Sequence, residues 1–239
     1  MDGAPFRVSR NQFGTLGYSI RRYLVDDFHF RHVATLPERG LVLDLGGNRI
    51  RKRGFFDIEQ FGLEVFYANL STAKQPHVQA DAGAIPFGRE VFDAVICAEL
   101  LEHVPYPPAV LAEAHRVLRK GGVFLLCVPF LNRIHGDPHD YGRYTDSYWL
   151  RTLEAAGFGD IRIEKQGRFW CVLVDMIRDL VVRKTGSGVL ARPSAIRLLA
   201  AIMAMCKRKA LQWDSAADAE EGRNPVGYTT GFGIIARKE

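Results

Sequence analysis

The stretch Leu41-Val42-Leu43-Asp44-Leu45-Gly46-Gly47-Asn48 decides the fold of this chain. It predicts a short apolar strand that ends in an acid and is followed by a glycine turn. α/β domains build phosphate or nucleoside sites in this way, because a glycine has no Cβ to hold the ligand away from the backbone. The alternative is an ordinary core strand followed by a tight turn, since short glycine motifs have many false positives.

Strand and helix patterns alternate on the C-terminal side of this stretch. Strand patterns cover residues 41–45, 64–69, 77–80, 91–98, 123–128, 161–165 and 228–238. Helix patterns lie within 11–36 and over 109–119, 147–156, 170–183 and 194–209. We expect Gly121-Gly122 to stop the helix over 109–119, Ser194 to cap the last helix, and 214–223 to form a mobile loop. Residues 48–60 are polar and basic, so no long helix is expected there. The alternation predicts an α/β fold with a mostly parallel sheet.

Composition indicates an ordinary globular protein of 239 residues, with 47% apolar and 25% charged residues. Cys97, Cys127, Cys171 and Cys206 form no C-x-x-C pair, and the start of the chain lacks an apolar signal segment. No run of 18 apolar residues predicts a membrane span. We therefore expect a cytoplasmic protein with reduced thiols.

Positive charge is concentrated between residues 162 and 213, which hold 11 Lys or Arg against 3 Asp or Glu. Within a single domain over 1–239, we divide the chain into an N-terminal helical cap (1–37), a core (38–165), a helical insertion (166–225) and a last strand (226–239). We favour a lid or a homodimer interface as the role of the insertion. Its apolar helices with flanking Lys and Arg also suggest peripheral membrane contact through 166–213.

Five consecutive sequence motifs carry a resemblance to a known protein family. They are Val42–Gly47, Asp81–Phe87, Phe92–Val104, Arg116–Gly122 and Ala156–Phe158. In order and spacing, residues 41–158 resemble the class I S-adenosylmethionine-dependent methyltransferases, in particular the type 11-like branch. The resemblance implies a Rossmann-like sheet of seven strands with an antiparallel last strand, and a helical insertion before that strand. It implies S-adenosylmethionine as cofactor and S-adenosylhomocysteine as product. The missing third glycine argues against a nicotinamide dehydrogenase.

The resemblance also implies which residues bind the cofactor. Asp44, Gly46 and Gly47 would line its methionine and ribose end. Asn69 stands where the family usually has an acid that holds both ribose hydroxyls, which predicts weaker binding. Asp81 would accept from the adenine amino group, with the Ala82 amide near the ring, although Asp81 also suits an Asx turn. Ala98 and Glu99 would border the methionine.

The substrate side is expected after the fifth strand, between residues 129 and 145. His135 or His139 suits a general base, Asp140 can orient a histidine, and Arg143 can bind an anion. Tyr144 is the fifth candidate catalytic residue in this segment. Alternatively, Asp140, Arg143 and Tyr144 only pin the loop. A metal site from His135, Asp137, His139 and Asp140 has no further ligand cluster to support it, so no metal is expected. Glu102 and His103 suit either function or the packing of a helix start.

These observations predict an enzyme that methylates a small-molecule or lipid-linked acceptor, with oxygen as the favoured atom. A non-catalytic binding or scaffold protein on the same fold is the alternative, because fold does not dictate function. RNA methylation is a weaker alternative. The basic segment lacks interleaved aromatic residues and the chain lacks an RNA-binding module, so we expect no specific nucleic acid as partner.

Overall fold

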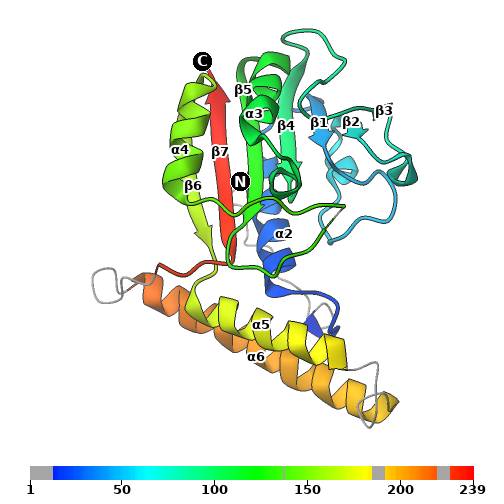
Figure 1. Cartoon of the computed structure of the whole chain (residues 1–239), viewed down its shortest axis with the longest axis vertical. Coiled ribbons are helices and arrows are strands. Elements are labelled where there is room, and N and C mark those ends of the chain that lie inside the picture. The colour runs from blue at the N-terminus through cyan, green and yellow to red at the C-terminus, as the bar shows by residue number, and fades with distance from the viewer. Residues whose placement is uncertain (1–12, 137, 185–191, 220–226) are drawn as a thin grey trace.

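A seven-stranded sheet in the order β3-β2-β1-β4-β5-β7-β6 forms the centre of the molecule (Figure 1). The computed structural model describes residues 13–136, 138–184, 192–219 and 227–239. The strands are β1 (Leu41–Leu45), β2 (Glu64–Asn69), β3 (Val78–Gln79), β4 (Phe92–Ala98), β5 (Leu118–Pro129), β6 (Phe158–Gln166) and β7 (Gly231–Lys238). β7 runs antiparallel to both of its neighbours, while β1 to β5 pair in parallel. This confirms the predicted sheet and its antiparallel last strand.

Helices cover both faces of the sheet. They are α2 (Ile20–Val33), α3 (Pro107–Val117), α4 (Asp146–Ala155), α5 (Phe169–Lys184) and α6 (Pro193–Ala219), with 3-10 helices at Ile58–Phe61, Thr72–Lys74 and Leu101–His103. α2 packs on the face that carries Val42 and Ile96, and α3 and α4 pack on the face that carries Leu43 and Val95. Phe28 of α2 is fully buried. Burying a side chain of this size contributes about 1.5–3 kcal/mol.

α5 and α6 lie side by side below the carboxyl edge of the sheet, and we call this pair the helical arm (Figure 1). They connect β6 to β7, as the predicted insertion requires. Among the described residues, no helix combines the length and apolar content needed to cross a membrane.

Buried charged side chains join the helical arm to the rest of the molecule. Asp175 of α5 accepts hydrogen bonds from the Ile20 and Arg21 amides (2.9 and 2.7 Å), so it caps the first turn of α2. Lys207 of α6 donates to the carbonyls of Thr15 and Tyr18 (3.0 and 2.6 Å). Burial lowers the pKa of Lys207 to about 8. The arm is therefore bound to the N-terminal segment by polar contacts as well as by packing.

Three local predictions are wrong. The helix before β5 ends at Val117 rather than at Gly121-Gly122, because Leu118 already pairs with Phe92 and is fully buried in the sheet. α6 begins at Pro193, so Ser194 lies inside its first turn instead of capping it.

The third error concerns residues 214–219, predicted as the start of a mobile loop, which continue α6. Asp214 explains the difference, because its buried carboxylate accepts hydrogen bonds from the amides of Arg168, Trp170 and Cys171 at the start of α5 (2.7–3.1 Å). The rest of that expected loop, residues 220–223, lies outside the described residues.

Candidate active site

A pocket of about 890 Å³ opens at the carboxyl ends of β1, β2, β3 and β4. Residues that follow these strands form most of its wall, and α2 and the loop after β5 complete it. Parallel strands place their carboxyl ends at one edge of a sheet, where α/β domains bind ligands. The quoted stretch around Asp44 therefore lies in the wall of this pocket.

The glycine turn after β1 has a conformation that other residues would disturb. Gly46 has a φ of +82°, and a Cβ at this position would lie 2.8 Å from Leu100 Cδ1. A Cβ at Gly47 would lie 2.2 Å from the Asp44 carboxylate. Both glycines thus let the turn fold back onto the end of β1 and keep Asp44 in the pocket wall.

Asp44 is a half-buried acid whose carboxyl has a raised pKa. Burial raises the pKa of its carboxyl to about 7, and the nearby Lys52 ammonium opposes only part of that rise. Lys52 itself lies over the Tyr67 ring, with Nζ 4.2 Å from the ring centroid. A cation bound in the pocket would favour the charged form of Asp44 further.

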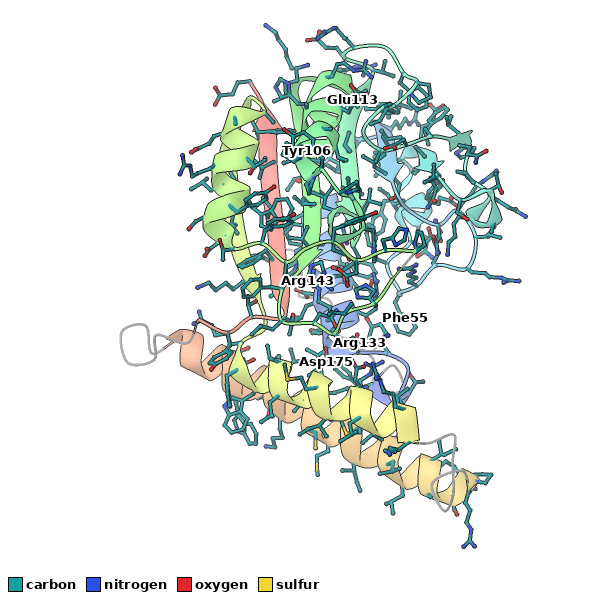
Figure 2. The ribbon with its side chains drawn as sticks, viewed as in Figure 1. Phe55, Tyr106, Glu113, Arg133, Arg143 and Asp175 are labelled. Carbon is teal, nitrogen blue, oxygen red and sulfur yellow. The ribbon has the colours of Figure 1, made fainter. Side chains whose placement is uncertain are left out.

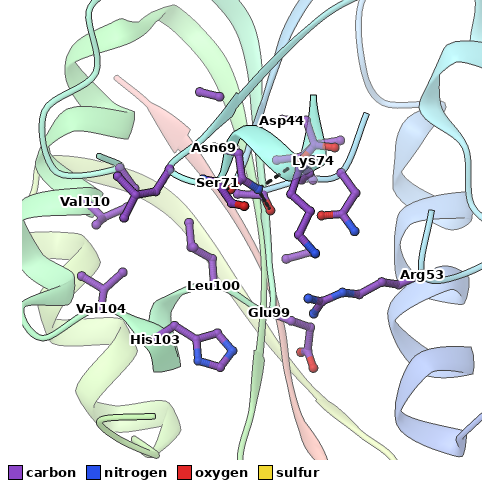
Figure 3. Close-up of a pocket in the computed structure, with 18 of the residues that line it drawn as sticks. Asp44, Arg53, Asn69, Ser71, Lys74, Glu99, Leu100, His103, Val104 and Val110 are labelled. Atoms are coloured by element: carbon purple, nitrogen blue, oxygen red, sulfur yellow. Dashed lines mark hydrogen bonds between the residues drawn. The ribbon is translucent and has the colours of Figure 1, made fainter. Parts of the chain in front are cut away.

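Asn69 holds the glycine turn in place. Its Nδ2 donates to the carbonyls of Gly46 and Gly47 (2.9 and 3.1 Å), and its Oδ1 accepts from the Ser71 amide (2.9 Å; Figure 3). A carboxylate at this position has no proton to donate to those carbonyls. Asn69, which stands where the resembling family usually has an acid, therefore stabilises the glycine turn through its amide hydrogen bonds.

Glu99, at the end of β4, is held by Arg21 of α2. Both side chains are buried, and the Arg21 Nη2 to Glu99 Oε1 distance is 2.5 Å. Burial pushes the pKa of Glu99 upward, but the Arg21 guanidinium outweighs it, so the pKa lies below its ordinary value. Glu99 has a φ of +54°, a conformation that is rare outside glycine and often marks a functional site. Asp81 forms the expected Asx turn with the Gly83 amide (2.8 Å) and also lines the pocket.

Beyond Glu99, a second buried acid lies between two histidines. Glu102 Oε1 is 3.6 Å from His103 Nε2 and 3.8 Å from His135 Nε2. Glu102 is 2% exposed, and neither of its carboxylate oxygens has a hydrogen-bond partner. Burial raises the pKa of Glu102 to about 8, with the neighbouring Glu99 charge adding to the rise. His103 points into the pocket (Figure 3).

The loop after β5 brings His135 to this acid. The Asp140 carboxylate accepts from the His135 amide (2.9 Å) and forms a two-point ion pair with Arg143. Arg133 pairs with Asp179 of α5 at 3.3 Å, which ties the same loop to the helical arm. Arg143, Arg133 and Asp175 lie between the sheet edge and α5 in Figure 2.

All eight residues predicted to bind a cofactor line the pocket. They are Asp44, Gly46, Gly47, Asn69, Asp81, Ala82, Ala98 and Glu99. Among the five residues predicted for catalysis, His139 lines the pocket, while His135, Asp140, Arg143 and Tyr144 do not line it. Tyr144 stacks on Tyr148, with ring centroids 4.1 Å apart. Asp137 lies outside the described residues.

Comparisons with known proteins agree with this geometry. Residues 54–126 match the family model described as "Methyltransferase domain". The chain has the fold of a SAM dependent methyltransferase from Archaeoglobus fulgidus, with a TM-score of 0.54, 15% identity, and coverage of 91% of this chain and 94% of that one. The chain thus has the fold of the class I methyltransferases, and residues 54–126 carry the sequence match to a methyltransferase domain.

Two further proteins resemble this methyltransferase domain. Over 99 residues it is 34% identical to the ubiquinone/menaquinone biosynthesis C-methyltransferase UbiE of Brucella canis. The aligned part is 41% of this chain and 30% of that protein, so the chain matches less than a third of this relative's length. The [4+2]-cyclase SpnF has the same fold, with a TM-score of 0.56, 18% identity, and coverage of 91% of this chain and 80% of that one.

The sequence predicted an N-terminal helical cap over 1–37 but did not identify the residues through which α2 reaches the pocket. Val25, Asp26 and His29 line it, and Arg21 holds Glu99. The helical pattern of this segment is visible in the sequence, but its neighbours on the sheet are not. The pairing of Glu102 with His135 was also missed, because 33 positions separate these residues along the chain.

Proposed function

We propose that the protein transfers a methyl group from S-adenosylmethionine to a hydroxyl oxygen of a small-molecule acceptor and releases S-adenosylhomocysteine. One observation carries this proposal. The eight residues carried over from the family for the cofactor all line a single pocket, which also exposes His103 and His139. The cofactor and an acceptor would therefore meet in one cavity at the carboxyl edge of the sheet.

The pocket residues suit the cofactor's charges. S-adenosylmethionine has a positive sulfonium and a positive ammonium group, and Asp44 and Glu99 supply acids on the same wall. Asp81 would accept from the adenine amino group, and the glycine turn would give the ligand close access to the backbone. Asn69 would act on the ribose end indirectly, by holding that turn.

Methylation of a hydroxyl requires that the acceptor molecule is correctly positioned and that a base accepts the hydroxyl proton. When the methyl group moves, the sulfur–carbon bond breaks, its electron pair stays on sulfur, and an oxygen–carbon bond forms. The hydroxyl proton must leave, and we assign it to His139, the one of the two predicted bases that lines the pocket. We assign positioning roles to His135, Asp140 and Arg143, and we place Tyr144 among the residues that anchor the loop.

A phenol or hydroquinone is the acceptor class that we propose. The Brucella relative is named for quinone biosynthesis. The name of that relative specifies carbon as the methylated atom. For this chain we propose oxygen, and the hydrogen-bond acceptor atoms of Glu102 and the two histidines beside it support this choice. The O-methyl and C-methyl products of a hydroquinone differ in their NMR spectra, so the product itself tests this assignment.

We also propose that the helical arm contacts an anionic membrane surface. Large apolar side chains of the arm are exposed, including Met176, Leu180, Leu198 and Met205 at 54–62% exposure. α5 and α6 do not contribute to the described wall of the main pocket, which gives the lid interpretation less support. A membrane-bound arm would give lipid-linked acceptors a short route to the site.

Calorimetry and turnover together test the proposed function. We expect wild-type protein to bind S-adenosylmethionine and S-adenosylhomocysteine with one site per chain. His139→Ala should lower kcat at least about 100-fold with cofactor affinity unchanged, which is typical for loss of a general base. The exposed histidine variant His77→Ala is the control. Absence of binding to either cofactor form would contradict the proposal.

A reaction other than methyl transfer is the second candidate. The fold is shared by a protein named as a [4+2]-cyclase, which shows that this architecture does not determine the chemistry. A protein that binds the cofactor but never consumes it would fit this candidate. Incubation with cofactor that carries a labelled methyl group and a panel of phenols distinguishes the two, since only a methyltransferase moves the label to the acceptor.

A further inference from the structure

Three atoms that can accept hydrogen bonds converge beside the pocket, where His103 lines its wall. They are a Glu102 carboxylate oxygen, His103 Nε2 and His135 Nε2, and all lie within 4.8 Å of one another. The Glu102 oxygens and His103 Nε2 are buried and have no hydrogen-bond partner. Unpaired buried acceptors are costly, so an arrangement of this kind calls for a positive group among them.

Backbone carbonyls determine which nitrogen of each histidine is free. His103 Nδ1 lies 2.6 Å from the His139 carbonyl, and His135 Nδ1 lies 3.1 Å from the Arg133 carbonyl. A carbonyl only accepts, so His103 Nδ1 carries the proton and His103 Nε2 keeps its lone pair toward Glu102. His135 Nδ1 has the Arg133 carbonyl at 3.1 Å and the Arg143 Nη2 donor at 3.5 Å, and the nearer carbonyl favours the same tautomer. Metal-binding histidines are held in this way, with the second ring nitrogen bonded to a carbonyl or carboxylate.

The surrounding charges leave room for a cation. Arg21 is paired with Glu99, and Arg143 is paired with Asp140. Glu102 has no Arg or Lys ion pair within the described ranges, and the two histidines lie nearest to its carboxylate, while Glu99, Arg21 and Arg143 act on it from further away. A cation bound here would take the place of the Glu102 proton.

We propose that Glu102, His103 and His135 form a binding site for a divalent first-row transition metal ion of the zinc, iron or manganese class. Two ligands of one tetrahedral zinc ion, each at about 2.0–2.1 Å, lie about 3.4 Å apart. The observed separations of 3.6 and 3.8 Å, with the third within 4.8 Å, require the side chains to move inward to bind one ion. Two imidazoles and one carboxylate are a known ligand set for such ions.

The ion would leave a coordination position for an oxygen in the pocket, because His103 lines the cavity. A bound phenol would lose its proton more readily, and a phenol with a neighbouring oxygen would bind through both atoms. This role rests on the proposed function, whereas binding of the ion does not. The metal set considered from the sequence differs, since it shares only His135 with this cluster.

Cobalt binding tests the site directly. Full-length protein without an affinity tag is treated with a chelator and then titrated with Co²⁺, followed by visible absorption, and with Zn²⁺ in competition. We expect one Co²⁺ per chain, displaced by Zn²⁺. Glu102→Gln, His103→Gln and His135→Gln should each weaken binding at least about 100-fold, more than is usual for outer partners of metal ligands.

His139→Gln is the matched control, because it removes a histidine of the same loop whose ring is outside the cluster. It should leave the Co²⁺ affinity unchanged. If circular dichroism shows that Glu102→Gln does not fold, His135→Gln provides the test, because His135 lies on the more exposed side of the cluster. Failure of wild-type protein to bind one Co²⁺, or equal affinity in the wild type and the ligand variants, would overturn the proposal.

S-adenosylhomocysteine is titrated into the same samples. Metal binding without binding of this cofactor form would overturn the proposed function and leave the metal site standing. Cofactor binding without metal binding would overturn the metal site alone, and would mean that a proton occupies the space between Glu102 and the histidines.

Discussion

Asp44 shows how a single residue can favour ligand binding at the expense of stability. Burial raises the pKa of its carboxyl to about 7, so the folded protein holds this proton more tightly than the unfolded chain does. The unfolded chain therefore releases the proton first as pH rises, and stability falls between about pH 4 and pH 7. Above pH 7, a buried charge without a cation remains in the empty pocket.

Asp44→Asn should therefore stabilise the cofactor-free protein, most clearly at high pH. A pKa near 7 against an ordinary value near 3.8 corresponds to a cost of up to about 4 kcal/mol at pH 8 and about 1–2 kcal/mol at pH 5. We expect a higher Tm for the variant at pH 8 and a smaller rise at pH 5. Binding of S-adenosylmethionine should weaken at least about tenfold, because the attraction to its positive groups is lost.

Differential scanning calorimetry at both pH values and titration calorimetry measure these effects. Asp160→Asn is the control, since Asp160 is 45% exposed in its side chain and distant from the pocket. A fall in Tm at pH 8 for Asp44→Asn, in the absence of cofactor, would contradict the assignment of a destabilising buried charge.

At the scale of elements, helices are capped by acids from other helices. Asp175 of α5 caps the start of α2, and Asp214 of α6 caps the start of α5. Each carboxylate accepts backbone hydrogen bonds that local residues leave unmade, and it also favours the positive end of the helix dipole. Because α2 carries Arg21, the helical arm also supports the residue that holds Glu99.

Asp175→Ala should destabilise the protein by about 2–3 kcal/mol, since two buried amides at the start of α2 lose their acceptor. Urea denaturation measures this loss. Asp179→Ala, one turn further along α5, removes only partly exposed ion pairs with Arg133 and Arg178, and should cost less than about 1 kcal/mol. Equal losses for the two variants would mean that the cap contributes nothing beyond a surface charge.

At the scale of the whole molecule, the helical arm has two chemically distinct sides. Its inner side holds Asp175 and Lys207 against the N-terminal segment. α6 also exposes apolar residues such as Leu198 and Met205, and its exposed basic residues include Arg208 and Lys209. Apolar side chains with neighbouring Lys and Arg are typical of helices that lie on an anionic membrane.

Vesicle flotation tests whether the exposed side of the helical arm binds an anionic membrane. Wild-type protein should float with phosphatidylglycerol-containing vesicles and remain below with pure phosphatidylcholine. A double variant, Leu198→Glu with Met205→Glu, should bind at least about tenfold more weakly, because two side chains no longer enter the lipid. Leu150→Glu on α4 serves as the control. Loss of a solution dimer in the double variant, without vesicle binding by the wild type, would identify the face as a homodimer interface instead.

Sequence reasoning was most accurate where one residue type satisfies a local requirement. Gly46 needs a positive φ, and Asp44 and Asp81 directly follow or end strands, so the motif alone located all three in the pocket. It was least accurate for side chains whose partners lie far along the chain. Asp214 was assigned to a loop because its three amide partners are more than 40 residues away.

The sequence by itself determined the order of strands and helices along the chain and the glycine turn, and its family resemblance indicated eight of the residues that line the pocket. These features depend on apolar periodicity, on backbone conformation and on short spacings, all of which are local. The tertiary structure alone decided that Arg21 meets Glu99, that Asn69 braces the turn, and that Glu102 lies between His103 and His135. Those contacts depend on how the sheet orders its strands and on which helices cover them, and no local pattern encodes that arrangement.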